Sequence, residues 1–112
     1  MITNQTTKTT LAKEAEHCKS VISKAKGLMF TKKIKDKGLI FHFNKEKIVA
    51  LHMFFVFYPI DILFLDKNQR IVEIKKQLKP FATYMPKNKA KYVIELPANS
   101  IKNTRIKDKI KF

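Results

Sequence analysis

The sequence predicts a mainly β fold, a compact β-sandwich or partly closed barrel of about six to eight short strands with one or two short helices. From Gly38 onward, short runs rich in Ile, Val, Phe and Tyr recur at regular spacing. The most apolar stretch, LHMFFVFYPIDILFLD at residues 51–66, contains Pro59. Because proline is tolerated at the first residue of a strand or at a bulge, this stretch reads as two strands meeting at Tyr58-Pro59. Continuous apolar strands are typically covered on both faces, which favours a layered architecture.

The N-terminal third allows two interpretations. The first ten residues, MITNQTTKTT, are polar and are expected to form a tail or an edge strand, which leaves residues 11–112 as a single β-rich domain. From Leu11 to Met29, apolar residues recur at helical spacing, which favours one long helix. Ser20 is also a good N-cap and Gly27 a good residue to end a short helix, which favours an extended segment before it.

The remaining elements follow from composition and turn chemistry. Strands are expected at residues 38–43, 51–57, 60–66, 70–76 and 91–96. The tetrapeptide Asp66-Lys67-Asn68-Gln69 is a plausible hairpin loop between two of them. The stretch LKPFATYMPKNKA at residues 78–90 reads as a long, Lys-rich connection.

The chain is strongly basic. It carries 24 Lys and Arg against 9 Asp and Glu, a formal net charge of +15. All but two of the basic residues are Lys, which acts as a point charge, whereas base recognition favours the planar fork of Arg. A Lys excess can also be compositional, as in thermophile proteomes. The charge therefore permits polyanion binding without demonstrating it.

Location and redox state are constrained by what the chain lacks. Cys18 is its one cysteine, so no internal disulfide can form and no metal or redox motif is present. The polar N-terminus is neither a signal nor a transit peptide, and the apolar run at 51–66 is too short and too interrupted to span a bilayer. A cytoplasmic protein without a membrane partner is expected.

No catalytic, nucleotide-binding or metal-binding motif is present, and neither a cofactor nor a metal is expected. The ionisable residues in apolar settings are Asp61, His52, His42 and Glu95. Asp61 has two interpretations. It can accept hydrogen bonds from backbone N–H groups at the Pro59 bend and hold the strand junction, or it can act as a ligand or acid–base group with His52 nearby.

Residues 79–92 interleave lysines with aromatic rings, the mixture that single-strand binders use for backbone charge and base stacking. The candidate binding residues here are Lys79, Tyr84, Lys87, Lys91 and Tyr92. The alternative is a solvated loop whose aromatic rings face the core. No known nucleic-acid-binding motif supports the first interpretation, so nucleic acid stays an open partner.

Several blocks occur in the order found in a known family. They are KGLMF (26–30), GLIFHF (38–43), HMFFVFYPIDILFLD (52–66), RIVEI (70–74), LKPF (78–81), MPKNKAKYVIELPA (85–98) and IKDKIKF (106–112). Together they resemble domain of unknown function family 192, an uncharacterised protein family, over residues 18–112, and the HMFFVF wording resembles its archaeal branch.

The resemblance implies a mainly β, sandwich-like fold in which Leu11–Cys18 is a strand, Ser20–Lys26 a helix and Gly27 its terminator. This chain departs from the family twice. Residues 52–56 read His-Met-Phe-Phe-Val where bacterial members have Trp-Met-Lys-Asn-Thr, so a polar pocket made there is absent. Asn99 replaces a glycine, and asparagine tolerates the left-handed conformation that glycine would supply.

The sequence therefore predicts a small binding or accessory domain, with catalysis uncertain. One alternative is a small-molecule enzyme with a pocket around Asp61 and His52. The other is a polyanion-binding protein that uses residues 79–92. An enzyme is expected to have a concave pocket with Asp61 at its floor, whereas a binding module is expected to have a flat basic or apolar face.

Overall fold

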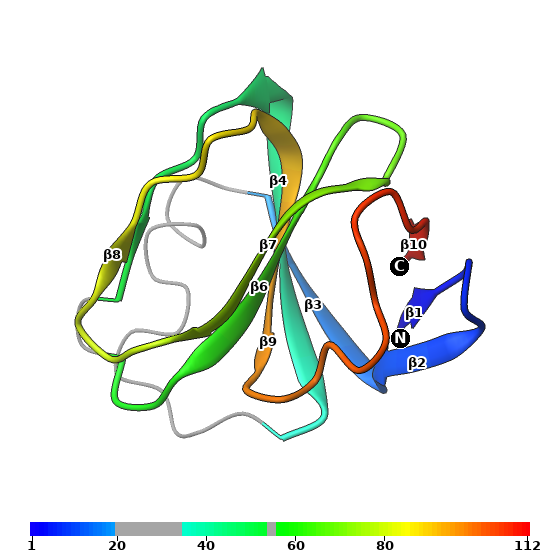
Figure 1. The fold of residues 1–112 in the computed structure, drawn as a ribbon, viewed down its shortest axis with the longest axis horizontal. Helices are drawn as coiled ribbons and strands as arrows, with labels where there is room; N and C mark the ends of the chain where they lie inside the picture. The colour runs from blue at the N-terminus through cyan, green and yellow to red at the C-terminus, as the bar shows by residue number, and fades with distance from the viewer. Residues whose placement is uncertain (20–34, 54–55) are drawn as a thin grey trace.

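The central element of the fold is β6 (Ile60–Leu65), in which every residue is buried. The computed structural model describes residues 1–19, 35–53 and 56–112. In it β6 lies inside a five-stranded sheet of order β3-β4-β9-β6-β7 (Figure 1). The other strands of this sheet are β3 (Glu14–Cys18), β4 (Lys37–Lys47), β7 (Ile71–Leu78) and β9 (Ala90–Pro97). Because both faces of β6 are covered, all its residues except Asp61 are apolar.

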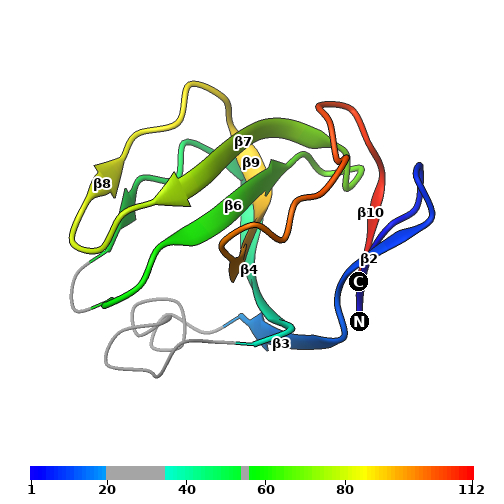
Figure 2. The ribbon, with the colours of Figure 1, turned by 60° about the horizontal axis from the view of Figure 1, so that its bottom comes forward.

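Two smaller sheets lie on either side of the central one. A three-stranded sheet joins β10 (Ile110–Lys111), β1 (Ile2–Asn4) and β2 (Thr9–Ala12), which brings the two ends of the described chain together. A two-stranded ribbon pairs β5 (Leu51–His52) with β8 (Thr83–Tyr84). Figure 2 shows this ribbon and the three-stranded sheet at opposite ends of the molecule.

Two apolar clusters hold these layers together, one on each face of the central sheet. Along β6, Ile60, Ile62 and Phe64 belong to the first cluster, together with Met53 and Leu78. The alternate residues Leu63 and Leu65 belong to the second cluster, which includes Ile2 and Ile110 of the three-stranded sheet. The two-residue period of a strand thus assigns successive side chains of β6 to different cores.

The structure confirms the mainly β fold and resolves the N-terminal alternatives in part. Residues 11–12 lie in β2 and residues 14–18 in β3, which confirms the extended segment that the family resemblance implied at Leu11–Cys18, with a break at Lys13, over the interpretation of one long helix. None of the described residues is helical. The short helix predicted at Ser20–Lys26 and its terminator Gly27 lie outside the described residues, and no described helix is long and apolar enough to cross a membrane.

Two predicted turns are present. In the 66–69 loop, the Asp66 side chain accepts hydrogen bonds from the backbone of Asn68 and Arg70, and Gln69 has a φ of 62°. Asn99 has a φ of 67°, so asparagine does occupy the left-handed position expected of it. The strand predicted at 51–57 is shorter than expected, because β5 ends at His52.

Candidate functional site

Asp61 is a buried residue whose carboxylate connects separate segments of the backbone. Its side chain is 2% exposed and accepts hydrogen bonds from the backbone N–H of Gln77 at 2.8 Å and of Ser100 at 3.0 Å. Gln77 and Asn99 both have positive φ, and the Gln77 amide donates to Asn99 Oδ1 at 2.8 Å. The carboxylate therefore fastens the end of β7 to the turn after β9.

His52 lies on a different sheet from Asp61. It is exposed on β5, opposite Thr83 of β8, whereas Asp61 is buried in the central sheet. The structure therefore does not bring these two side chains together, and the geometry for a shared acid–base role is missing.

The two tyrosines predicted to stack on bases are engaged within the protein. Tyr84 is half-buried beside Phe64, with ring centroids 5.9 Å apart, and its hydroxyl donates a hydrogen bond to Glu73. That bond, together with burial, raises the pKa of Tyr84 to about 12. Tyr92 packs edge-on against His42 at 5.4 Å and Phe112 at 5.2 Å.

Glu73 fixes the ribbon to the central sheet. Besides the Tyr84 hydroxyl, its carboxylate accepts hydrogen bonds from the backbone of Lys87 and from both the backbone and the side chain of Asn88. Burial alone would raise the pKa of Glu73, but the bonds from Tyr84, Asn88 and Lys87 outweigh it and lower that pKa. The residues that follow β8 are thus held in place by one buried carboxylate.

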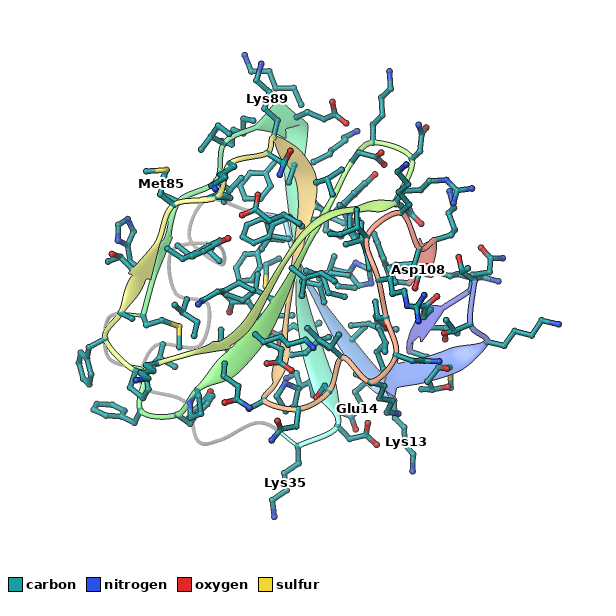
Figure 3. The ribbon with its side chains drawn as sticks, viewed as in Figure 1. Lys13, Glu14, Lys35, Met85, Lys89 and Asp108 are labelled. Carbon is teal, nitrogen blue, oxygen red and sulfur yellow. The ribbon has the colours of Figure 1, made fainter. Side chains whose placement is uncertain are left out.

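The outer side of the ribbon presents a different surface. From Phe81 to Pro86 the side chains alternate: residues 81, 83 and 85 are exposed, whereas residues 82, 84 and 86 are buried or half-buried. Phe81 is 52% exposed and Met85 67% exposed, and Figure 3 shows Met85 at the outer rim of the molecule. Phe57, which is 60% exposed, packs edge-to-face on Phe81 with centroids 5.4 Å apart. Phe57 and Phe81 therefore form an exposed aromatic pair, and Met85 is exposed farther along the same segment as Phe81.

We call this surface the ribbon face. It consists of the exposed residues His52, Phe57, Lys79, Phe81, Thr83, Met85 and Lys87. The sequence prediction included His52, Lys79 and Lys87 but placed the functional rings at Tyr84 and Tyr92. Tyr84 is half-buried, whereas Phe81, in the turn before β8, and Met85, directly after β8, are exposed.

Phe81 also carries backbone strain. Its φ of 62° lies in the left-handed region, where a bulky side chain is disfavoured by roughly 1–2 kcal/mol. Strained and exposed apolar residues concentrate at functional sites, because stability alone would select glycine or asparagine at such a turn.

The ribbon face is also basic. The two segments that form it, residues 47–60 and 79–94, contain no Asp or Glu. Lys79 and Lys87 are exposed, and the Lys75 ammonium lies 5.6 Å from the Tyr84 ring centroid. Apolar side chains and lysines therefore share one surface that has no acidic residue in its own segments.

The match to a family model covers residues 2–112 and corresponds to domain of unknown function family 192, described as an uncharacterized ACR. The chain belongs to this family. Its curated relatives include a UPF0127 protein of Pyrococcus horikoshii, 36% identical over 97 residues that cover 87% of this chain and 84% of the relative. A UPF0127 protein of Thermococcus sibiricus is 37% identical over 89 residues, which cover 76% of this chain and 56% of the longer relative. These relatives are uncharacterised, and both are archaeal, as the resemblance implied.

Two solved structures have the same fold. One is a suggested transcription regulator from Sinorhizobium meliloti, with a TM-score of 0.81 and 24% identity over 87% of this chain and 79% of that one. The other is a Novosphingobium aromaticivorans protein of unknown function, with a TM-score of 0.81 and 22% identity over 88% and 74% of the two chains. At these identities the likeness concerns the fold alone.

Proposed function

We propose that this family member is a cytoplasmic binding domain without catalysis of its own, which docks through the ribbon face on an anionic membrane surface. The observation that carries the proposal is the exposed Phe57–Phe81–Met85 group, set among lysines, with Phe81 held in a strained conformation. Exposed apolar patches rimmed by polar residues mark interaction sites. Adsorption to a bilayer needs no spanning segment, so it is compatible with the failure of residues 51–66 to qualify as one.

The chemistry of the ribbon face favours lipid over nucleic acid. Tyr84 and Tyr92, the rings expected to stack on bases, are turned inward. Phe57 and Phe81 meet at 75°, so they do not form a parallel stacking platform, and Met85 has no aromatic face. Apolar side chains surrounded by lysines instead match an interface in which acyl chains lie beneath anionic head groups. The regulator description of the Sinorhizobium protein does not alter this, because 24% identity carries no function.

The expected affinity for an anionic membrane is modest. Burying an exposed Phe or Met side chain contributes on the order of 1–2 kcal/mol, and a lysine near an anionic surface contributes about 1 kcal/mol. Three apolar side chains and two or three lysines therefore give several kcal/mol, which corresponds to reversible, salt-sensitive adsorption.

The test is vesicle co-sedimentation with phosphatidylcholine alone and with about one third phosphatidylglycerol, at low and at physiological ionic strength. We expect binding to the anionic vesicles only, weakened by salt. Phe57→Ser with Met85→Ser should lower it about tenfold or more, since each tenfold corresponds to 1.4 kcal/mol. The matched control is Ile106→Ser, which removes an apolar side chain that is 48% exposed in the loop before β10.

A second pair of variants separates local from total charge. Lys79→Glu with Lys87→Glu should weaken vesicle binding more than Lys13→Glu with Lys35→Glu, which changes the charge equally away from the ribbon (Figure 3). Equal losses in both pairs, or vesicle binding untouched by the apolar variants, would overturn the proposal. Salt-sensitive binding to single-stranded RNA that needs Phe57, without vesicle binding, would establish the nucleic-acid alternative instead.

A further inference from the structure

Two histidines from neighbouring strands meet at one edge of the central sheet. His17 Nδ1 and His42 Nε2 lie 2.8 Å apart, and the centroids of the two imidazole rings are separated by 5.0 Å. His17 is exposed and His42 is half-buried, so the pair is accessible from solvent. The two residues are 25 positions apart in the sequence, and for this reason no short sequence motif contains them both.

The sheet places both imidazoles on the same face. The edge strand β3 runs parallel to β4, with His17 beside Ile40 (Figure 1). His42 is two residues farther along β4, so its side chain leaves the same face of the sheet as that of Ile40. On the other side of β4, Tyr92 of β9 lies directly opposite His42. Strand pairing, rather than spacing along the chain, therefore creates the histidine pair.

Two aromatic rings support the imidazoles. The Tyr92 ring lies edge-on to His42, with centroids 5.4 Å apart. The Phe112 ring, directly after β10, lies 6.0 Å from that of His17 and 5.8 Å from that of His42. Phe112 and Tyr92 also contact each other, with centroids 5.2 Å apart. This packing limits the rotation of the imidazoles, so the two facing nitrogens are held close together before any ligand binds.

We infer that His17 and His42 together bind a divalent late transition metal ion, copper(II) or nickel(II), through Nδ1 of the first and Nε2 of the second. A bond from a metal to an imidazole nitrogen is about 2.0 Å long, so two such nitrogens are separated by about 2.8 Å at a right angle and by about 3.3 Å at the tetrahedral angle. The observed separation of 2.8 Å matches the right angle. Right angles between ligands are typical of tetragonal copper(II) and nickel(II), whereas zinc prefers a tetrahedron.

Both facing nitrogens must present a lone pair to the metal ion. In the hydrogen-bonded pair, one of the two nitrogens carries the proton between them. Each neutral imidazole has a second ring nitrogen that can hold its proton instead, so a change of tautomer exposes both lone pairs and leaves both rings neutral. The metal ion thus replaces the shared proton as the link between the rings.

The surroundings of the pair select the class of ion. Among the residues that the structure describes, no third His, Cys, Asp or Glu completes a group that could hold a metal, so water must fill the other positions on the ion. Magnesium and calcium need several oxygen ligands, which this pair does not supply. The net charge of +15 also opposes cations that are held mainly by electrostatic attraction. Nitrogen ligands suit copper(II) best among the divalent first-row ions, with nickel(II) next.

The experiment is a titration of the whole chain with copper(II), followed by electron paramagnetic resonance and by the paramagnetic broadening of NMR signals. We expect one preferred site, with hyperfine coupling to two imidazole nitrogens and with broadening centred on the rings of His17, His42, Tyr92 and Phe112. Nickel(II) should displace copper(II) from this site when in excess, whereas magnesium should not.

Histidine variants separate this site from other copper ligands of the chain. His17→Gln and His42→Gln should each lower the copper(II) affinity about tenfold or more and leave coupling to a single nitrogen. Because His17 is exposed, its variant is expected to fold, which circular dichroism checks. The matched control is His52→Gln, which removes the third histidine of the chain, on the ribbon face, and should retain both the affinity and the two-nitrogen signal.

Three results would overturn the inference. They are coupling to only one nitrogen in the wild-type protein, an affinity that is unchanged in His17→Gln, and an equal loss in His52→Gln. A chain that binds no copper(II) would likewise show that the two imidazoles form a hydrogen bond and nothing more. The inference is independent of the membrane proposal, because the pair lies on the central sheet and the ribbon is a separate sheet.

Discussion

Replacing Asp61 with Asn removes a charge from the junction of three chain segments. The carboxylate connects β6 to the backbone N–H of Gln77 at the end of β7 and to that of Ser100 after β9. Asparagine has nearly the same shape but a single acceptor oxygen, so its NH2 group must face one of these two N–H donors. One buried backbone donor is then left without a partner.

The magnitude follows from the two bonds. A hydrogen bond to a charged acceptor contributes about 1.5–3 kcal/mol, and an unsatisfied buried donor costs about 1–3 kcal/mol. Because asparagine retains one of the bonds in neutral form, the free energy of unfolding should fall by about 2–3 kcal/mol. For a chain of 112 residues this corresponds to a decrease in Tm of roughly 8–12 °C.

Urea unfolding followed by circular dichroism, together with thermal melts, measures this loss. Asp36→Asn is the control, since Asp36 also accepts a backbone hydrogen bond, from Lys13, but is exposed. It should cost well under 1 kcal/mol, as surface substitutions usually do. If Asp61→Asn is no more destabilising than Asp36→Asn, the structural role of Asp61 is refuted and a binding role gains support.

Three other predictions concern the ribbon and Glu95. Tyr84→Phe should destabilise by about 1 kcal/mol. Because the pKa of Tyr84 is raised from 10.0 to about 12, the contribution of its hydroxyl is complete below pH 10 and lost as pH rises through 12, so urea unfolding across this range should bring variant and wild type together. Phe81→Asn should leave the unfolding free energy within about 1 kcal/mol, because relief of the left-handed strain offsets the lost ring contact, yet vesicle binding should fall; a large loss of stability would contradict this. The pKa of Glu95 is raised from 4.5 to about 7, so the folded protein favours the protonated carboxyl. The free energy of unfolding is therefore highest, as far as Glu95 is concerned, below pH 4.5, and it falls as the pH rises through 7. Glu95→Gln should therefore be more stable than wild type at pH 8, by on the order of 2 kcal/mol, and show no gain at pH 4; a constant difference between the two would contradict the assignment.

The strands that the sequence predicted well are those with strong local patterns. The apolar run after Pro59 became β6, and the runs at 70–76 and 91–96 became most of β7 and β9. Their composition and turn chemistry act locally, so a single sequence carries them. The hairpin at 66–69 was predictable for the same reason, because the Asp66 side chain organises its own turn.

The elements that the sequence predicted poorly depend on distant partners. The strands β5, β8 and β10 are two residues long, and each exists only because another segment lies beside it. The parallel pairing of β3 with β4 likewise has no local signal, since the helical spacing of residues 11–29 competes with it. The caps at Ser20 and Gly27 left an extended segment before them open, and the family resemblance decided for it.

The candidate functional residues also depend partly on local sequence and partly on distant strand pairing. Composition drew attention to residues 79–92, but it could not tell which rings face outward. The answer depends on the register of β8, in which Leu51 opposes Tyr84 and His52 opposes Thr83. Once Tyr84 faces the core, its neighbours Thr83 and Met85 face outward. Phe81 is exposed as well, because it lies in the turn before β8.

The distribution of carboxylates bears on whether the charge of +15 has a role. Six of the nine acidic side chains accept hydrogen bonds from backbone N–H groups, namely Asp36, Glu46, Asp61, Asp66, Glu73 and Asp108. In the described part of the chain, only Lys13 and Lys37 form ion pairs with carboxylates. A thermophile-type excess of lysine is accompanied by glutamate in ion-pair networks, and that arrangement is missing among the described residues.

The lysines are not confined to one face, since Lys89 lies at the opposite end of the molecule from Lys13 and Lys35 (Figure 3). The charge alone therefore provides a general attraction to polyanions that salt will screen. It does not by itself select an orientation or a partner. The ribbon face can do so, because it combines lysines with exposed apolar side chains. Attraction by the whole surface and orientation by the ribbon face are separable, and the paired charge-reversal variants measure each of them.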